Sequence, residues 1–181
     1  MNRIQLFYKD MSEIVGSDGF SVVRLIDIDE QRAICVICDK AMTEQMTIRF
    51  NRLPGYQRML PEVLLDMFAA KEKANMELMV YDIIDGQYSV TLLNKYTLEH
   101  RPIRMSDAVL LHFISKIPIY IEEGLMQRQC TRYTPDAVGI SIPINTLDTE
   151  RLNQELERAI EAEDYHLASY LHEEIQRRNK Q

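Results

Sequence analysis

Three acidic side chains in the middle of the sequence belong to the residue types that hold divalent metal ions. Glu62 and Asp66 are four residues apart, so they share one face of any helix that contains them. Asp107 follows Arg104 and Ser106 at the start of an apolar stretch. Carboxylates that bind Mg²⁺ or Mn²⁺ help to activate water and neutralise charge on a phosphate. One interpretation is therefore a metal site of two or three carboxylates from Asp107, Glu62 and Asp66, with Arg104 or Arg58 close to the phosphate.

The same residues also have a purely structural interpretation. Ser106 is a favourable N-cap residue, and Asp107 suits the positive end of a helix dipole. Glu62 and Asp66 are equally typical of a solvated helix face. Both interpretations stay open at the level of the sequence.

Three arginines close to a Pro-Gly break are candidates for binding nucleic-acid phosphates. Arg49, Arg52 and Arg58 flank residues 54–55, and Tyr56 could stack on a base. Arginines in such loops are also common as solvated surface residues. A nucleic-acid contact and a plain surface role are therefore the two alternatives for this segment.

Two cysteines and one histidine have patterns that favour a role in the core. Cys35 and Cys38 have the spacing of some zinc and redox sites, but positions i and i+3 of a strand point to opposite faces. His112 lies in an apolar helical stretch. We expect buried thiols and a hydrogen-bonded core histidine.

The composition limits the classes of protein to which the chain can belong. It has 181 residues, of which 46% are hydrophobic and 27% charged, as in globular proteins. The formal net charge is −7: residues 1–133 carry 16 basic and 18 acidic side chains, and residues 134–181 carry 5 and 10. This balance disfavours nucleic acid as a partner without excluding it. Three cysteines, no signal-peptide pattern and no apolar run of membrane-spanning length indicate a cytoplasmic protein without membrane contact.

Residues 1–133 show the patterns of a mixed domain of helices and antiparallel strands. Asp85-Gly86 is a strong hairpin turn. The patterns predict strands over 20–28, 32–38, 76–84, 87–93 and 117–121, and helices over 40–52, 61–73, 107–116 and 122–129. The predicted fold class is α+β, an antiparallel sheet with packed helices.

Residues 134–147 read as a connector, and residues 148–181 as an antiparallel two-helix hairpin. Asp164 is a plausible N-cap at the joint of the hairpin. The apolar stripes consist of Leu152, Leu156, Ala159 and Ile160 on one helix and Tyr165, Ala168, Leu171 and Ile175 on the other. A hairpin of this size buries too little apolar surface to stand alone, so it must dock on the domain, on another copy or on a partner.

The residues around the central helix resemble the bifunctional nuclease (BFN) domain family. The stretch 104–111, Arg-Met-Ser-Asp-Ala-Val-Leu-Leu, and the later Lys-Ile-Pro-Ile-Tyr-Ile of residues 116–121 are similar to its motif. The strand pair over 79–93 also fits, and the resemblance covers roughly residues 1–130. Glu62 stands where that family often has histidine, and Val63 where it often has aspartate.

The end of the chain resembles a UVR motif, a short helical hairpin that mediates contacts between proteins. The similarity rests on the leucine and alanine spacing of residues 152–175, with Glu163-Asp164-Tyr165 at the joint. A BFN domain followed by a UVR motif is a familiar bacterial arrangement.

The two resemblances imply a nuclease that hydrolyses phosphodiester bonds of DNA and RNA with Mg²⁺ or Mn²⁺, and a homo-oligomer. Its expected catalytic residues are Asp107, Ser106, Arg104 and Glu62. The alternative is a non-enzymatic, oligomeric module whose hairpin binds repair or protease complexes. Its expected contacts are Tyr165, Ala168, Leu171 and Ile175.

Overall fold

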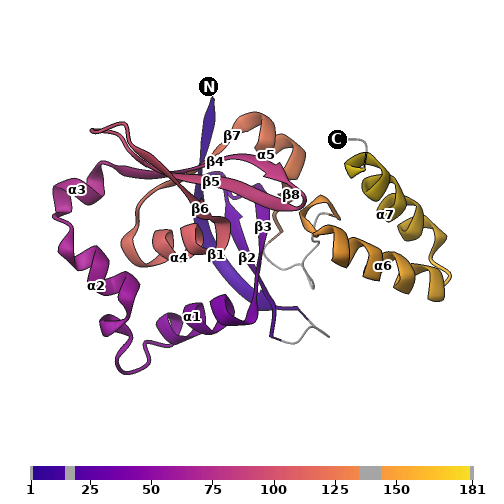
Figure 1. The fold of residues 1–181 in the computed structure, drawn as a ribbon, viewed down its shortest axis with the longest axis horizontal. Coiled ribbons are helices and arrows are strands. Elements are labelled where there is room, and N and C mark those ends of the chain that lie inside the picture. Colours follow the sequence, from indigo (N-terminus) through magenta and orange to yellow (C-terminus); the bar gives the residue numbers. More distant parts are fainter. Residues whose placement is uncertain (1, 15–18, 135–143, 180–181) are drawn as a thin grey trace.

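The computed structural model describes residues 2–14, 19–134 and 144–179, with helices and strands as labelled in Figure 1. The strands are β1 (Arg3–Glu13), β2 (Ser21–Ile26), β3 (Arg32–Cys38), β4 (Met76–Ile84), β5 (Gln87–Asn94), β6 (His100–Arg104), β7 (Ile119–Glu122) and β8 (Thr131–Arg132). The helices are α1 (Lys40–Phe50), α2 (Leu60–Met67), α3 (Ala70–Ala74), α4 (Met105–Ser115), α5 (Glu123–Gln129), α6 (Thr149–Glu161) and α7 (Tyr165–Arg178), with 3-10 turns η1 (Tyr56–Arg58) and η2 (Ile144–Thr146). The predicted α+β class is confirmed.

One sheet runs through the domain in the order β6-β5-β4-β7-β1-β2-β3-β8. Neighbouring strands are antiparallel except β4 and β7, which are parallel. β1 joins the two halves, because residues 3–6 pair with β7 and residues 7–13 pair with β2. Its pairing with β2 shifts between Tyr8 and Asp10, a bulge that bends a strand and increases its twist. The sheet therefore curves around the helices.

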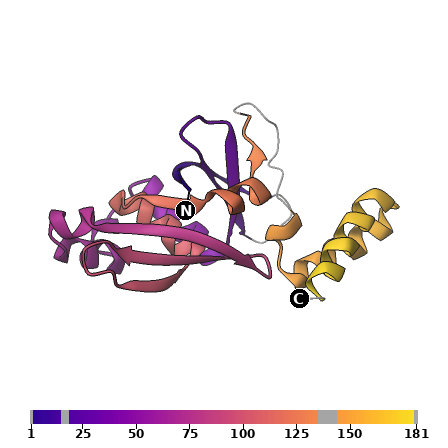
Figure 2. The same ribbon diagram turned by 90° about the horizontal axis from the view of Figure 1, so that it is seen from above.

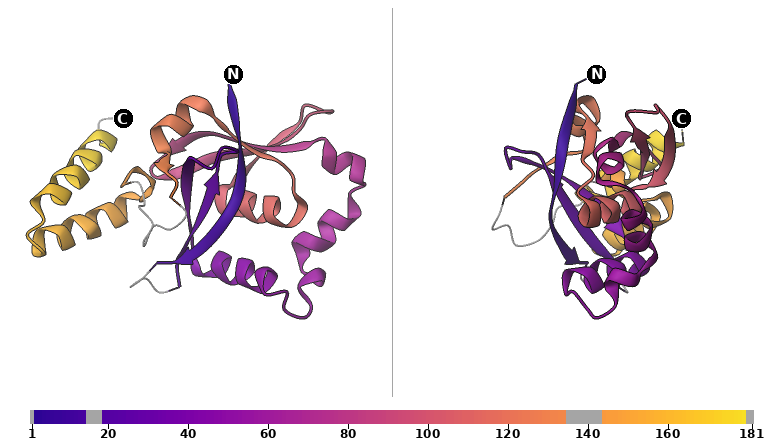
Figure 3. Two further views of the ribbon diagram at one scale, coloured as in Figure 1. Left: turned by 180° about the vertical axis from the view of Figure 1, so that it is seen from behind. Right: turned by 90° about the vertical axis from the view of Figure 1, so that its left-hand side faces the viewer.

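Helix α4 lies within this curve, beside α1 and α2 (Figures 1 and 3). It contacts strands from both halves of the sheet as well as both helices. Ala108 and Val109 are completely buried, and Leu110 is nearly so. A helix that is apolar nearly all round must bury most of its surface, which explains why it occupies the centre.

The C-terminal end of α4 is fixed by a histidine and a left-handed residue. Lys116 ends the helix with a φ of 60°, and its N–H donates to the carbonyl oxygen of His112. The His112 side chain is buried, and its Nδ1 lies 2.8 Å from the Ile117 carbonyl oxygen. Because a carbonyl only accepts, Nδ1 carries the proton in this contact. The expected hydrogen-bonded core histidine is thus confirmed.

The structure also corrects several sequence-based expectations. β1 and β6 were not expected as strands, and the helix expected over 61–73 is divided into α2 and α3 at residues 68–69. The N-cap of α4 is Arg104 instead of Ser106, which lies inside the first turn. Of the expected connector 134–147, residues 135–143 lie outside the described residues, and 144–146 form η2.

The last two helices pack against each other as a hairpin (Figure 2). Together with η2 they make up the helical tail, residues 144–179, whose own small core is built on Leu152, Ala159 and Leu171. Asp164 caps α7 as expected, because its side chain accepts a hydrogen bond from the Leu167 N–H. Ile160, expected in the seam, is 54% exposed on the outer surface.

We predict that His112 makes the folded protein less stable at acidic pH. Burial lowers the pKa of His112 below its ordinary 6.5. In the window below pH 6.5 the unfolded chain therefore binds a proton that the folded chain does not. The free energy of unfolding should be at its full value above that pH and fall by at most about 1.4 kcal/mol per pH unit within the window. Urea unfolding of the wild type and of His112→Asn measures this slope.

The control is His100→Asn, since His100 is exposed on β6. We expect His112→Asn to reduce the slope and His100→Asn to leave it unchanged. Equal slopes in all three proteins would show that His112 does not cause the pH dependence.

Candidate functional site

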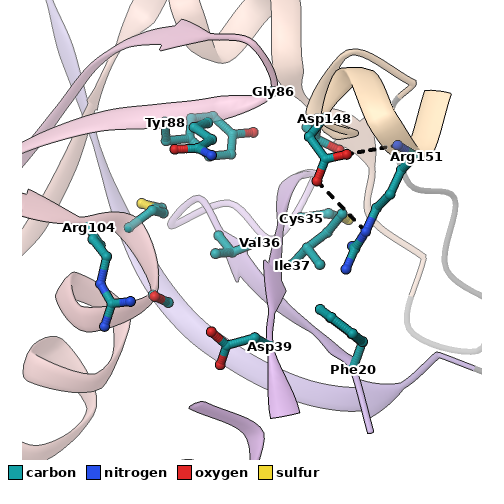
Figure 4. A pocket seen from close by; sticks show the side chains of 14 residues that line it. Phe20, Cys35, Val36, Ile37, Asp39, Gly86, Tyr88, Arg104, Asp148 and Arg151 are labelled. Atoms are coloured by element: carbon teal, nitrogen blue, oxygen red, sulfur yellow. Dashed lines mark hydrogen bonds and ion pairs between the residues drawn. The ribbon is translucent and has the colours of Figure 1, made fainter. Parts of the chain in front are cut away.

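A cleft of about 340 Å³, lined by polar and apolar residues alike, opens between the sheet, the start of α4 and the helical tail (Figure 4). Residues 35–37 of β3, Gly86 of the β4–β5 turn and residues 87–88 at the start of β5 line it from the sheet. Arg104 and Ser106 line it from α4, and residues of the tail line it from the opposite side. With Phe20, which precedes β2, five separate parts of the chain contribute to this one site.

Three helices begin at this cleft. Their N-cap residues, Asp39 of α1, Arg104 of α4 and Asp148 of α6, all line it. Helix N-termini carry partial positive charge and unpaired N–H groups, which favour anions. The Asp39 carboxylate accepts from the Met42 N–H and that of Asp148 from the Arg151 N–H, whereas α4 has no side-chain cap. Of the three helix N-termini at the cleft, only that of α4 has N–H groups that no side chain caps, so it is the candidate for binding an anion.

Arg104, whose side chain is 73% exposed, forms a surface ion pair with Asp107 at this turn. Its Nε lies 2.7 Å from Asp107 Oδ2, and its Nη2 lies 3.1 Å from Asp107 Oδ1. The hydrogen bonds and charge of Asp107 raise the pKa of Arg104, and Asp39 adds a smaller effect. The guanidinium is therefore cationic at any physiological pH, and Asp107 acts as its anchor.

Glu62 belongs to a different, structural contact. It forms a two-point ion pair with Arg49, in which Nη2 of Arg49 lies 2.7 Å from Glu62 Oε2. The Arg49 side chain is only 1% exposed, and Gln45 accepts two further hydrogen bonds from it. This pair joins α1 to α2. Arg49 was expected to contact nucleic acid and Glu62 to act in catalysis, but in this structure the two side chains are occupied by each other.

The three carboxylates expected to hold a metal ion do not come together. Glu62 and Asp66 line a hollow between α2 and the end of α4, whereas Asp107 lines the adjoining apolar groove between α2 and α4. Both Glu62 and Asp107 are already paired with arginines. Within the described ranges, no three His, Cys, Asp or Glu side chains are placed to hold a metal ion. The three expected carboxylates therefore do not form one metal site in this structure.

The other expected nucleic-acid contacts lie outside the cleft. Arg52 and Arg58 are exposed in the segment between α1 and α2. Neither is among the residues that line the cleft. A ligand in the cleft would therefore reach them only if it extended over the surface.

The thiols near the cleft are poor nucleophiles. Burial raises the pKa of Cys35 to about 11 and that of Cys38 to about 12. Both therefore stay protonated near neutral pH, and nucleophilic thiol chemistry needs the thiolate. The expectation of buried thiols is confirmed.

Asp39, Asp148 and Arg151 do not stand out in the sequence as site residues. Asp39 and Asp148 each precede a helical pattern, so a search for N-caps would find them as capping residues. Their meeting at one cleft depends on the tertiary fold, for which the sequence pattern carries no local signal.

The four residues expected to contact a partner have different environments in the hairpin. Leu171 is 1% exposed, and Ala168 and Ile175 pack around it in the core of the tail. Tyr165 is 70% exposed. Of the four, Tyr165 is therefore the exposed one, while Ala168 and Ile175 are partly buried.

Comparison with known proteins gives no further assignment. No protein-family model matches the chain, and no curated protein matches it either. Among the described residues, no helix combines the length and apolar character needed to cross a lipid bilayer.

We predict that Glu62 contributes to stability and not to metal binding. Glu62→Ala leaves the Arg49 guanidinium buried without its carboxylate, which should lower the free energy of unfolding by about 3 kcal/mol. Asp66→Ala, on the same helix and exposed, should change it by less than about 0.5 kcal/mol. Urea unfolding in the presence of a chelator measures both values. Equal stabilities of the two variants would contradict the structural role.

Proposed function

We propose that the protein is a nuclease of the bifunctional nuclease type, which hydrolyses phosphodiester bonds of DNA and RNA with a divalent metal ion. The observation that carries the proposal is the cleft at the uncapped start of α4, lined by Arg104 and Ser106. These two residues also belong to the stretch that resembles the family motif.

The first turn of α4 suits a phosphate group. A phosphate oxygen placed there would accept hydrogen bonds from helix N–H groups and from Arg104, two kinds of donor that favour anions. Because Asp107 holds Nε and Nη2, the N–H groups of Nη1 are left for the ligand. In this arrangement Arg104 binds and orients the phosphate, and Asp107 positions Arg104.

The Asp39 carboxylate faces the same cleft from the start of α1 (Figure 4). A carboxylate near a bound phosphodiester can orient the attacking water molecule. Asp39 is therefore the candidate for this task, in place of Glu62. The proposal assigns no ligands to the metal ion, since the expected carboxylates do not assemble.

We predict that Arg104→Gln lowers kcat/KM for phosphodiester cleavage by about tenfold to a hundredfold, the range expected when a charge-assisted hydrogen bond is lost. Asp107→Asn should lower it less, because the guanidinium remains but loses its anchor. The assay uses single-stranded DNA, RNA and plasmid DNA with Mg²⁺, Mn²⁺ or a chelator. Activity should require the metal ion.

The matched control is Arg101→Gln. Arg101 is exposed on β6, three residues before Arg104, and does not line the cleft. We expect this variant to retain wild-type activity. Equal loss in both arginine variants, or no metal-dependent cleavage by the wild type, would reject a nuclease site at this cleft.

The second candidate is a non-enzymatic role in which the hairpin binds another protein. Large side chains on its surface favour this alternative: Tyr165 and Tyr170 are 70% and 63% exposed. Aromatic residues are enriched among those that dominate binding energy in protein interfaces. The buried residues of the seam would support the hairpin without touching the partner.

We predict for this role that the double variant Tyr165→Ser/Tyr170→Ser loses proteins that the wild type retains from an extract of the source cells. Ser169→Ala, also exposed on α7, is the control and should retain them. Circular dichroism checks that the hairpin stays helical. Light scattering of the same samples measures the subunit number, since the resemblance leads us to expect a homo-oligomer. Identical retention by both variants would count against the binding role.

A further inference from the structure

The helical tail supplies one wall of the cleft. Thr146, Asp148 and Arg151 of the tail line the cleft, as do Arg104 and Ser106 of α4. In Figure 4, Arg104 and Arg151 enter the site from opposite sides, one from each part of the chain. The tail is thus more than an appendage, because the cleft has its present shape only while the tail is docked.

The turn between β4 and β5 holds the tail in this position. Asp85 Oδ1 accepts hydrogen bonds from Thr149 Oγ1 at 2.6 Å and from Arg178 Nη1 at 2.9 Å, so it contacts both helices of the hairpin. The pKa of Asp85 is lowered by these contacts. Gly86 has a φ of +73°, and a Cβ there would lie 2.3 Å from the Leu147 carbonyl oxygen. Glycine therefore permits the close approach of the turn to the tail.

Arg151 is oriented on the cleft side of the tail but is not fully paired. Its guanidinium carbon lies 4.2 Å from the centre of the Phe20 ring, and its Nε lies 3.8 Å from Asp148 Oδ2. A separation of 3.8 Å is too long for a hydrogen bond, so this ion pair leaves the N–H donors of the guanidinium available. The side chain is 28% exposed. It can therefore reach a ligand without breaking a strong contact.

We propose that Arg151 binds a phosphate group of single-stranded nucleic acid in the cleft, opposite Arg104, so that the binding site is complete only when the tail is docked. This inference rests on the proposed function for the type of ligand. A cleft of about 340 Å³ is near the lower end of ligand-pocket sizes and suits a nucleotide of a single strand better than a duplex. Two arginines on facing walls suit a phosphodiester that passes between them.

Docking of the tail and binding of the ligand are then coupled. A ligand that contacts both walls binds the docked form better than the undocked form, so it must also stabilise docking. By the same reciprocity, a protein that pulls the hairpin away from Asp85 weakens ligand binding. The tail thereby makes access to the cleft dependent on what the hairpin binds.

The test measures binding separately from cleavage. Fluorescence anisotropy with labelled oligothymidylate and oligouridylate, in low salt with a chelator, reports Kd without turnover. We expect Arg151→Gln to raise Kd by about tenfold, as for the loss of one charge-assisted contact. It should also lower the salt dependence of binding by about one phosphate contact. Arg151→Lys keeps the charge, so its Kd should lie between that of the wild type and that of Arg151→Gln.

The matched control is Arg158→Gln on the same helix, where Arg158 is exposed and pairs with Glu155. This variant should bind within about twofold of the wild type, since it loses only a surface charge. Equal weakening in Arg151→Gln and Arg158→Gln, unchanged binding in Arg151→Gln, or no binding by the wild type would each overturn the inference. A selective loss in Arg151→Gln without metal-dependent cleavage by the wild type would support the inference and reject the nuclease. Metal-dependent cleavage by the wild type together with unchanged binding in Arg151→Gln would support the nuclease and reject the inference about Arg151.

Limited digestion of the full chain with trypsin tests the coupling. Oligonucleotide should slow cleavage within residues 151–178, and Asp85→Ala should speed it and weaken the protection. Tail cleavage that is equally fast with and without oligonucleotide at saturating concentration would overturn the coupling.

Discussion

The burial of α4 is the constraint on which the rest of the structure depends. The helix has no polar face, so strands from both halves of the sheet and helices α1 and α2 must all cover it. The curvature of the sheet at β1 makes this enclosure possible. Because Met105 and Ala108 at the start of the helix are buried in this packing, its first turn has a fixed position. Arg104 and Ser106 are therefore presented to the cleft by the same packing that stabilises the core.

The sequence predicts those elements whose side chains alternate or repeat in an apolar pattern. The strand bounds predicted for 32–38 and 76–84 agree with β3 and β4, because those segments combine β-branched residues with clear turns at their ends. β6 was missed because it is an exposed edge strand in which Ile103 is the one large apolar side chain. The predicted helix over 61–73 continued through Phe68, whose extended backbone in fact separates α2 from α3. The apolar pattern of residues 61–73 shows which residues can be buried, but it carries no signal for the extended backbone at Phe68.

The site could be predicted from the sequence only where it is local. Arg104, Ser106 and Asp107 are neighbours in the chain, so their motif identifies them together. A site made of residues distant in sequence cannot be predicted in this way, because the tertiary fold decides which partner each side chain contacts. Glu62 reaches Arg49, thirteen residues away in sequence, and this buried pair takes up the carboxylate that the metal hypothesis required. Arg151 reaches the cleft only through the docking of the tail, and its local sequence predicts a helix and nothing more.

The acidity of the chain does not decide whether the cleft can bind an anion. The net charge of −7 describes the long-range field, which salt screens over about 8 Å at physiological ionic strength. A phosphate in contact with Arg104 and the first turn of α4 would lie well within that distance, although the Arg104 side chain is 73% exposed to solvent. The acidic tail even contributes Arg151 to this surface, while many of its carboxylates lie on exposed helix faces. The cleft itself is lined by two arginines, Arg104 and Arg151, and by two carboxylates, Asp39 and Asp148, so its side-chain charges balance. A phosphate contact there would depend on short-range hydrogen bonds and not on general attraction to nucleic acid. We therefore expect slow association with nucleic acid and a salt dependence that reflects few phosphate contacts.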